Sequence, residues 1–159
     1  MTSSPIEIRV GDADDWEIWR AVRLRALSES ASAFSSVLAD WQGVGDTEAR
    51  WRARLTDVEH NVIAFVDELS VGQASGYRHD GRVELISMFV ASEARRLGVG
   101  RALIDAVVEW ATRLGHESVE LSVRRDNSAA IAAYERCGFV ATENREDTPI
   151  DERLMRRAL

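Results

Sequence analysis

The chain has 159 residues, with 20 basic and 27 acidic side chains that give a formal net charge of −7 at neutral pH. Its length and its hydrophobic share of 45% are those of an ordinary globular protein, so we expect a single domain over residues 1–159. The acidic balance disfavours general binding to nucleic acid, because a phosphate lattice needs a basic surface.

The residue types that are rare or missing exclude several further classes. All 20 basic residues are arginine, which excludes a Schiff base on a lysine of the protein and the lysine of a phosphate-loop NTPase. The one cysteine, Cys137, cannot form an internal disulfide. The N-terminus does not have the order of a signal peptide, and no apolar run approaches the length of a membrane span. We therefore expect a cytoplasmic protein with no membrane partner.

The first elements are a strand and a helix. Residues 6–10 alternate in polarity and predict a short strand that stops at Gly11. The predicted helix has an apolar face formed by Ile18, Trp19, Val22 and Ala26. Three aspartates precede it, at positions 12, 14 and 15. We interpret them as caps of the helix rather than as metal ligands.

A second helix is predicted after an irregular stretch. Residues 28–45 are small and polar, but they carry Phe34 and Trp41, so we do not expect a free linker. Asp46 and Thr47 can open a helix whose apolar side chains are Trp51, Leu55 and Val58. We interpret the tryptophans of this region as core residues.

Three strands are predicted in series in the middle of the chain. The runs 61–66, 72–78 and 83–90 are rich in β-branched and aromatic residues. Asp80 and Gly81 stand between the last two runs, and an Asp-Gly pair in that position is a strong hairpin signal. We expect an antiparallel meander.

The second half of the chain alternates helices and strands. A helix is predicted from Val99 to Gly115, a strand over 118–123, a helix over 126–137 closed by Gly138, and strands over 139–142 and 151–159. The element order β-α-α-β-β-β-α-β-α-β-β describes an α/β protein with a mixed sheet and a β-α-β crossover in its second half.

The most informative segment is residues 94–103, which join a predicted strand to a predicted helix. Gly98 and Gly100 let the backbone approach a ligand closely, and three arginines lie beside them. Exposed N–H groups at the positive end of a helix favour a pyrophosphate. A Rossmann fingerprint would need a third glycine at position 103, which is leucine, and a Walker loop would need a lysine.

Several positions together resemble one known family. They are Arg95, Gly98 and Gly100 after a strand, followed downstream by Asn127, Tyr134, Gly138 and Phe139. This pattern resembles the GNAT superfamily of N-acetyltransferases, whose pyrophosphate loop for acetyl-CoA reads Q/R-x-x-G-x-G/A. The resemblance implies a GNAT-like, mostly antiparallel sheet of six to seven strands flanked by about four helices, with acetyl-CoA as cosubstrate and no metal.

The resemblance also assigns residues to the cosubstrate. It implies that a bulged strand splays from its neighbour and that its main chain pairs with the pantetheine arm at Met88, Phe89 and Val90. An N–H near Phe89 or Val90 would stabilise the oxyanion. Asn127 would bind the cosubstrate from the opposite wall. The pyrophosphate would lie on the main chain of Arg95, Arg96, Leu97, Gly98, Val99, Gly100, Arg101 and Ala102.

Two residues are candidates for catalysis. By the resemblance, Tyr134 is the general acid that meets the departing CoA thiolate and also contacts the cosubstrate. Glu84 is our candidate base, because we expect it on one strand face with the apolar side chains of Ile86, Met88 and Val90. A solvated Glu84 without a role is the alternative. Three histidines, His60, His79 and His116, could compete with it, whereas we interpret Cys137 as a packed residue and not as a nucleophile.

The acceptor is an amine of a small molecule or a peptide, by the same resemblance. Residues 24–55 would shape its site, with Phe34, Trp41 and Trp51 as walls, and the acidic balance of the chain would suit a cationic amine. Acetyl transfer would be direct, in a ternary complex. A non-catalytic acyl-CoA sensor is the alternative function, because it would keep the loop but would need neither Glu84 nor Tyr134. A homodimer is left open.

Overall fold

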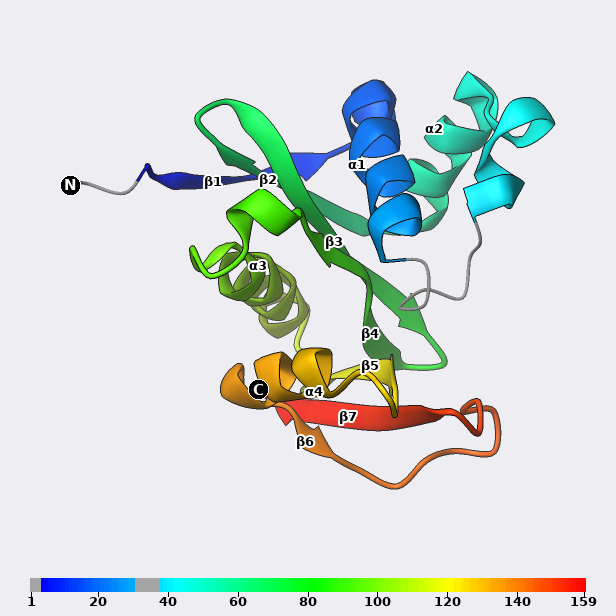
Figure 1. Cartoon of the computed structure of the whole chain (residues 1–159). Helices are drawn as coiled ribbons and strands as arrows, with labels where there is room; N and C mark the ends of the chain where they lie inside the picture. The colour runs from blue at the N-terminus through cyan, green and yellow to red at the C-terminus, as the bar shows by residue number, and fades with distance from the viewer. Residues whose placement is uncertain (1–3, 31–37) are drawn as a thin grey trace.

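The computed structural model describes residues 4–30 and 38–159, which form a seven-stranded sheet with helices on both faces (Figure 1). The strands are β1 (Ile6–Gly11), β2 (His60–Val66), β3 (Leu69–His79), β4 (Arg82–Val90), β5 (Ser118–Arg124), β6 (Val140–Ala141) and β7 (Glu152–Ala158). The helices are α1 (Trp16–Glu29), α2 (Glu48–Asp57), α3 (Val99–Arg113) and α4 (Ser128–Arg136). The predicted order of these elements is confirmed, although β6 is shorter than the predicted strand.

The sheet has the strand order β1-β2-β3-β4-β5-β7-β6. Neighbouring strands are antiparallel except β4 and β5, which are parallel and are connected through α3. Asp80 and Gly81 turn the chain between β3 and β4 with φ values of 49° and 74°, which confirms the predicted hairpin. Mostly antiparallel pairing with one parallel crossover is the predicted arrangement.

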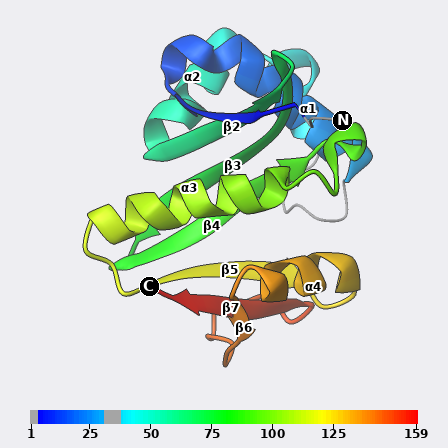
Figure 2. The same ribbon diagram turned by 90° about the vertical axis from the view of Figure 1, so that its left-hand side faces the viewer.

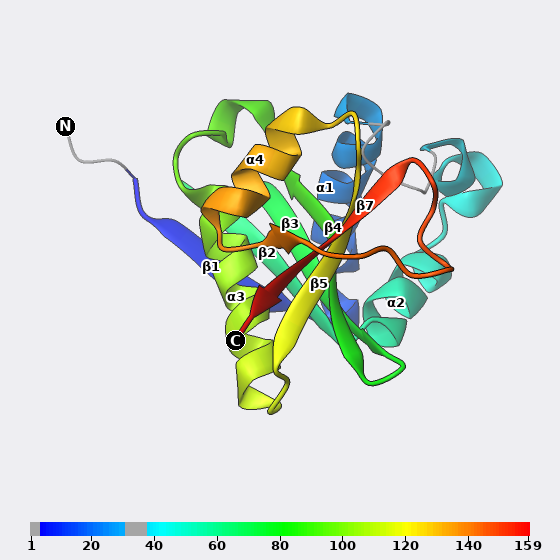
Figure 3. The same cartoon turned by 90° about the horizontal axis from the view of Figure 1, so that it is seen from below.

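Strand β7 lies inside the sheet rather than at its edge. It pairs with β5 over seven positions and with β6 on its other side (Figure 3). The predicted last strand is thus confirmed. Strand β6 has two residues and pairs with Arg156 and Met155, so it covers part of the outer edge of β7.

The aspartates before α1 cap the 3-10 turn Ala13–Asp15, which leads directly into this helix. The Asp12 carboxylate accepts a hydrogen bond from the Asp14 N–H at 2.8 Å, and the Asp15 carboxylate accepts one from the Asp12 N–H at 2.9 Å. This reciprocal pattern satisfies donors at the helix start without a metal ion. Trp19 is fully buried, but Ile18 is 36% exposed, so its place on the predicted apolar face is wrong.

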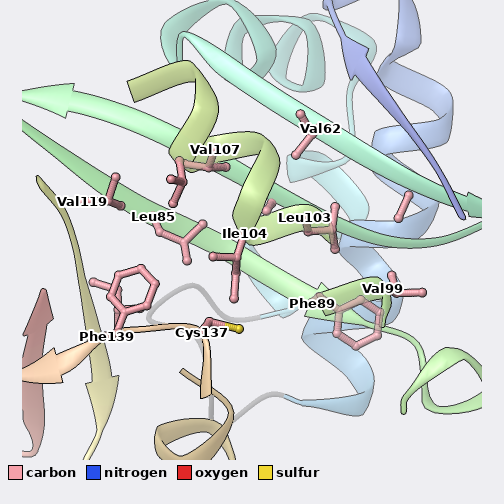
Figure 4. Close-up of a cluster of buried hydrophobic side chains, with 14 of the residues drawn as sticks. Val62, Leu85, Phe89, Val99, Leu103, Ile104, Val107, Val119, Cys137 and Phe139 are labelled. Carbon is pink, nitrogen blue, oxygen red and sulfur yellow. The ribbon is translucent and has the colours of Figure 1, made fainter. Parts of the chain in front are cut away.

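The buried side chains form two clusters, and the larger one includes Val22 and Ala26 of α1 as well as residues of α3. Helix α3 packs on one face through residues such as Leu103 and Val107, and Cys137 and Phe139 join this cluster after α4 (Figure 4). Helices α1 and α2 cover the opposite face, where the fully buried Trp51 packs with other apolar residues. Full burial of a side chain of this size contributes about 1.5–3 kcal/mol, so both faces hold their helices firmly.

A buried carboxylate ties β5 to the C-terminal part of the sheet. Glu120 of β5 is 5% exposed and accepts hydrogen bonds from Arg145 at 2.6 Å and from Arg156 of β7 at 2.9 Å. Burial alone would raise the pKa of Glu120, but the two arginines together outweigh burial and hold the pKa below its ordinary value. The charged residues of β7 therefore support its place in the sheet.

We predict that Glu120→Gln lowers the free energy of unfolding at pH 7 by about 1–3 kcal/mol, because the charge-assisted hydrogen bonds are lost. A lowered pKa stabilises the folded state above the unfolded-state pKa of about 4.3, and this contribution is lost as the pH falls through the folded-state pKa. Urea unfolding at several pH values should show a difference between wild type and variant that is constant near neutrality and shrinks in acid. A difference that does not change with pH would contradict this account.

Candidate active site

Strands β4 and β5 separate soon after they begin to pair. Their pairing comprises two positions, Val83 with Val119 and Glu84 with Glu120, and beyond these the strands diverge (Figure 2). A cavity of about 1360 Å³ lies between them and reaches residues of α1, α3 and α4. Because β5 does not follow β4 further, main-chain N–H and C=O groups on that edge of β4 face the cavity instead of a strand.

The pairing of β4 with β3 also breaks in this half of the strand. Ile86 lies opposite Ser75 and Phe89 lies opposite Gln73, so Ser87 and Met88 together face a single position of β3. Ser87 has a positive φ of 56°. This is a β-bulge, and the bulge that the family resemblance implies is confirmed.

The bulge changes which face of the sheet the side chains occupy. Ile86 lies opposite Ser75, whose hydroxyl accepts a hydrogen bond from an arginine of α2, so Ile86 and Glu84 face α2. After the bulge, the side chains of Met88 and Val90 face the first turn of α3 and lie within contact distance of it. The prediction that Glu84 shares a face with Met88 and Val90 is therefore wrong, because strict alternation ignores the extra residue of the bulge.

The glycine loop ends at the first turn of α3. Gly98 has φ of 90°, in the left-handed region that favours glycine, and Val99 is the first helical residue. The Ala102 N–H donates to the Gly98 C=O at 3.1 Å. The N–H groups of Val99, Gly100 and Arg101 precede this bond, so they have no helical acceptor and are free for an anion. Ala102 uses its N–H inside the helix and has none to offer a ligand.

The side chains of the loop divide between the cavity and other surroundings. The cavity is lined by Arg95, Arg96, Gly98, Gly100 and Arg101. Leu97 is 53% exposed and Val99 is buried in the core. Arg101 donates a hydrogen bond to the Arg136 C=O at 2.7 Å, which connects the loop to the last turn of α4. The arginines thus supply positive charge around the free amides.

Helix α4 forms the wall opposite β4. Asn127 is its N-cap, and the side-chain Oδ1 accepts a hydrogen bond from the Ala130 N–H at 3.2 Å. Asn127 and Tyr134 both line the cavity. The structure therefore brings Asn127, Tyr134 and the glycine loop together around one space. The carbonyl of Asn127 already caps the helix, which leaves its NH₂ group for a ligand.

Tyr134 lies against apolar neighbours. Its ring packs edge-on against the Phe139 ring, with 5.9 Å between the centroids. Burial, with a smaller contribution from Cys137, raises the pKa of Tyr134 to about 12. The phenol therefore keeps its proton at neutral pH and can act as a hydrogen-bond donor.

Glu84 has a partner that we did not expect. Its Oε2 lies 2.9 Å from Nε2 of His79, and the side chains of both residues are about one-third exposed. The ring of His79 also stacks on Tyr77, with 5.1 Å between the centroids. His79 is the last residue of β3, and the hairpin turn at Asp80 and Gly81 that follows brings it back to Glu84. Glu84 itself lines the cavity.

Two arginines of the first helices also line the cavity, and sequence analysis missed them. They are Arg23 of α1, which is 8% exposed, and Arg54 of α2. Arg54 follows Trp51 by three residues and therefore lies on the predicted apolar face of its helix. An arginine on an apolar face was the signal that could have found this part of the site.

Two of the three residues expected to form the walls of the acceptor site lie in the described part of the chain. Trp41 and Trp51 both line the cavity and pack together, with 4.4 Å between ring centroids. Trp51 is fully buried and donates to Asp46 at 2.8 Å, so its interpretation as a core residue is confirmed. Phe34 lies outside the described residues.

Two other side chains that could react, those of His60 and Cys137, are buried and packed against neighbouring residues. His60 is buried and stacks on Trp110, with 4.8 Å between the ring centroids, and burial lowers its pKa. A histidine packed in this way is a poor candidate for the base. Cys137 is buried in the core cluster, as we interpreted it. In the part of the chain that the structure describes, no group of three histidine, cysteine or carboxylate side chains could hold a metal ion.

Among the described helices, none combines the length and the apolar character that a membrane crossing requires.

Comparison with known proteins identifies the class. Residues 24–139 match the acetyltransferase (GNAT) family. This match covers more than half of the chain, and the chain belongs to this family.

Individual relatives differ in how much of the chain they share. An aminoglycoside N(6')-acetyltransferase type 1 of Stenotrophomonas maltophilia is 29% identical over 158 residues, which cover 90% of this chain and 92% of that protein. Human N-acetyltransferase 8 is 31% identical over 88 residues, or 55% of this chain. The chain matches 38% of that human protein and 18% of a mycothiol acetyltransferase of Geodermatophilus obscurus, so these relatives share only part of their length with it.

Solved structures share the whole fold. The PaiA N-acetyltransferase of Thermoplasma acidophilum in complex with coenzyme A has a TM-score of 0.77 at 21% identity, covering 98% of this chain and 99% of that one. The structure of YncA from Salmonella typhimurium with its cofactor acetyl-CoA has a TM-score of 0.73 at 22% identity, covering 98% and 94%. These similarities establish the predicted GNAT-like fold.

We predict different effects for the two loop glycines. Gly100→Val should weaken coenzyme A binding at least about tenfold, because a side chain would stand beside the free amides. The backbone at Gly100 has room for a Cβ, which would meet the side chains of Met88 and Val90 at ordinary contact distances of 3.5 Å or more. Gly98→Ala should instead cost about 1–2 kcal/mol of stability, because alanine tolerates a positive φ poorly.

Isothermal titration calorimetry with coenzyme A and thermal unfolding separate these effects. Gly43→Ala is a matched control for backbone strain, because Gly43 also has a positive φ but does not line the cavity. Unchanged coenzyme A affinity in Gly100→Val would contradict the assignment of the loop.

Proposed function

We propose that the chain transfers the acetyl group of acetyl-CoA directly to an amine in a ternary complex. The observation that carries this proposal is the convergence of three features on one cavity: the free amides of α3, the unpaired edge of β4, and Tyr134. The free amides suit a diphosphate, and the unpaired edge of β4 suits the amide groups of a pantetheine arm. Tyr134 suits a thiolate leaving group. Membership of the acetyltransferase (GNAT) family supports the same interpretation.

The first turn of α3 would hold the diphosphate. The N–H groups of Val99, Gly100 and Arg101 point to the positive end of the helix, and phosphate oxygens accept hydrogen bonds from such groups. Arg95 and Arg96 would add charge from the cavity wall. Leu97 and Val99 would take part through their main chain, because their side chains point elsewhere.

The unpaired edge of β4 would bind the pantetheine arm as an added strand. Met88, which ends the bulge, and the following Phe89 and Val90 lie on this edge, and their alternate N–H and C=O groups can pair with amides of the arm. An N–H near Phe89 or Val90 would donate to the thioester oxygen as negative charge develops on it. Asn127 would contact the arm from α4 through its NH₂ group.

Tyr134 would assist the departure of the thiolate. Its phenol is protonated at neutral pH because burial raises its pKa to about 12. A thiol has a pKa of about 8.5, so complete proton transfer from this phenol is uphill, and a strong hydrogen bond to the thiolate is the main contribution. The proton that the new amide releases then neutralises the thiolate as the product leaves.

Glu84 would accept a proton from the attacking amine. A primary alkylamine has a pKa near 10.4 and is almost fully charged at neutral pH, so it must lose a proton before it can attack. Glu84 lines the cavity, and His79 fixes its carboxylate through a contact of 2.9 Å. We propose His79 as a positioning residue for Glu84.

The proposal is tested by incubating the protein with acetyl-CoA and a panel of primary amines. Free thiol and the mass of the acetylated product are measured together. Turnover with at least one amine is expected. Calorimetric binding of acetyl-CoA without turnover of any amine would favour the non-catalytic sensor and would overturn the enzymatic function.

We predict that Tyr134→Phe lowers kcat by about 10- to 1000-fold, because the hydrogen bond to the departing thiolate is lost. The affinity for coenzyme A should change little, since the ring and its packing on Phe139 remain. Steady-state kinetics and calorimetry on the same preparation measure both quantities. Equal kcat in the variant would remove Tyr134 from the catalytic step.

We predict that Glu84→Gln lowers kcat/KM by about 10- to 100-fold near neutral pH and moves the rate optimum to alkaline pH, where the amine is already neutral. Glu135→Gln is a matched control, because Glu135 is exposed on α4 and does not line the cavity. His79→Gln should change the pH profile in the same direction but less. An unaltered profile in Glu84→Gln would mean that Glu84 is not the base.

A further inference from the structure

The carboxylate of Glu152, the first residue of β7, lies in the wall of the cavity. Glu152 lines the main cavity of about 1360 Å³ together with Glu84 and Tyr134, and it also lines a smaller cavity of about 200 Å³. Glu84 and Ser122 line both cavities as well. Glu152 therefore lies where the two cavities adjoin.

Strand register places Glu152 on the same face of the sheet as Glu84. Glu84 of β4 pairs with Glu120 of β5, and Arg124, four residues after Glu120, pairs with Glu152 of β7. Side chains at paired positions, and at every second residue of a strand, share a face. The hydrogen bond from Arg156 to Glu120 at 2.9 Å agrees, because Arg156 follows Glu152 by four residues. Both carboxylates thus face the side of the sheet that α2 covers at β4.

The same register gives the height of Glu152 along the opening between β4 and β5. Because these strands are parallel, Arg124 lies about as far from the position paired with Glu84 as Met88 lies from Glu84 itself. Four residues of strand span about 13 Å. Glu152 therefore stands at the height of Met88 and Phe89, which is where the proposed function puts the thioester. Glu84 stands lower along the strand.

Tyr134 approaches this point from the opposite face of the sheet. Val123 of β5 belongs to the buried cluster that contains Phe139, and the ring of Tyr134 packs on Phe139. The neighbours of Val123 in the strand face the other way, and Glu152 is on their side. The residue that meets the thiolate therefore does not occupy the path of the amine.

In the part of the chain that the structure describes, the carboxylate of Glu152 makes no hydrogen bond and no ion pair. Its main chain is fixed, because its N–H donates to the Pro149 C=O at 2.9 Å and its C=O accepts from Nδ2 of Asn144 at 3.0 Å. The side chain is partly buried. Glu152 thus presents a firmly placed carboxylate to the cavity.

The charged groups around Glu152 make its negative charge unfavourable. Burial raises its pKa, the charges of Asp151 and Glu84 raise it further, and Arg124 opposes them with the smallest influence. Arg124 is itself paired with Asp126 at 3.2 Å and with Asp151 at 3.1 Å. A cation that enters beside Glu152 would favour its ionised form and remove this cost.

Other arginines of the two cavities are directed elsewhere. In the smaller cavity, Arg145 donates to Glu120 at 2.6 Å, and Arg82 lies 3.8 Å from the carboxylate of Asp80. Carboxylates outnumber guanidinium groups in the wall of this cavity. In the main cavity, Arg54 donates to side chains of β2, β3 and β4, on the other side of the opening from β7.

We propose that Glu152 binds the ammonium group of the acceptor and holds the amine at the height of the thioester. This inference rests on the proposed function and names its substrate class: a basic primary amine that arrives in its protonated form. An ammonium has three N–H donors, so it can contact Glu152 and still give one proton to Glu84. The neutral amine that remains keeps its hydrogen bond to Glu152, and its lone pair is free to attack the thioester carbon.

The first experiment compares each amine with the alcohol of the same shape. Calorimetry measures binding to wild-type protein saturated with coenzyme A, for butylamine, benzylamine and glycinamide and for butanol, benzyl alcohol and glycolamide. Any amine that is acetylated in the turnover screen is added with its alcohol. Amines should bind at least about tenfold more tightly, because an alcohol brings no positive charge to Glu152. This comparison needs no variant, so it decides even if a substitution prevents folding.

Variants then test Glu152 itself. Glu152→Gln should remove the preference for amines over alcohols and raise the KM for the acceptor at least about tenfold, while kcat and the affinity for coenzyme A change little. Glu152→Asp keeps the charge and should recover part of the preference. Glu146→Gln is the matched control, because Glu146 is exposed in the segment before β7 and lines neither cavity.

The outcomes separate this inference from the proposed function. Equal binding of amines and alcohols, or an unchanged KM in Glu152→Gln, would overturn the inference and leave the proposed function intact. A lower kcat at unchanged KM would make Glu152 a proton acceptor rather than a binding residue, and would also overturn it. A preference for amines that Glu152→Gln removes, without turnover of any amine, would support the inference and overturn the proposed function.

Discussion

The separation of β4 from β5 is the constraint on which the rest of the site depends. A parallel strand that followed β4 to its end would satisfy its main-chain groups and would fill the cavity. The pairing with β5 ends at Glu84, and the bulge at Ser87 and Met88 in the pairing with β3 then directs Met88 and Val90 toward α3. The separation of the strands leaves the cavity and its hydrogen-bonding edge, and the bulge adds the contact with the glycine loop.

The net charge of the chain reflects its exposed surface and does not indicate the charge of the side chains that line the cavity. The acidic excess is carried largely by exposed side chains, while both ends of the cavity present cations: the loop arginines at α3, and Arg23 and Arg54 at the first two helices. Because screening by water is weak in a cavity, the nearby arginines determine the local potential more than the distant surface acids do. Ligand charge is better inferred from the wall of the site than from composition.

Sequence patterns predicted the elements, their order and the glycine loop, because these depend on local periodicity and on glycine at defined positions. The hairpin at Asp80 and the caps before α1 are local in the same way. The patterns failed where one residue of bulge reversed the strand faces, and where His79 met Glu84 across a turn. Arg54 was missed because its partners come from three different strands, which only the folded sheet brings together.

The position of β7 between β5 and β6 has a consequence for the order of assembly. Helix α4 and its tyrosine follow β5 directly, yet β5 lacks its antiparallel neighbour until residues 152–158 are in place. During synthesis the β1 to β4 meander and its two helices can pack early through contacts between nearby segments. The wall that carries Tyr134 can acquire its final position only after the ribosome has released β7, so a nascent chain should become competent for its ligand late.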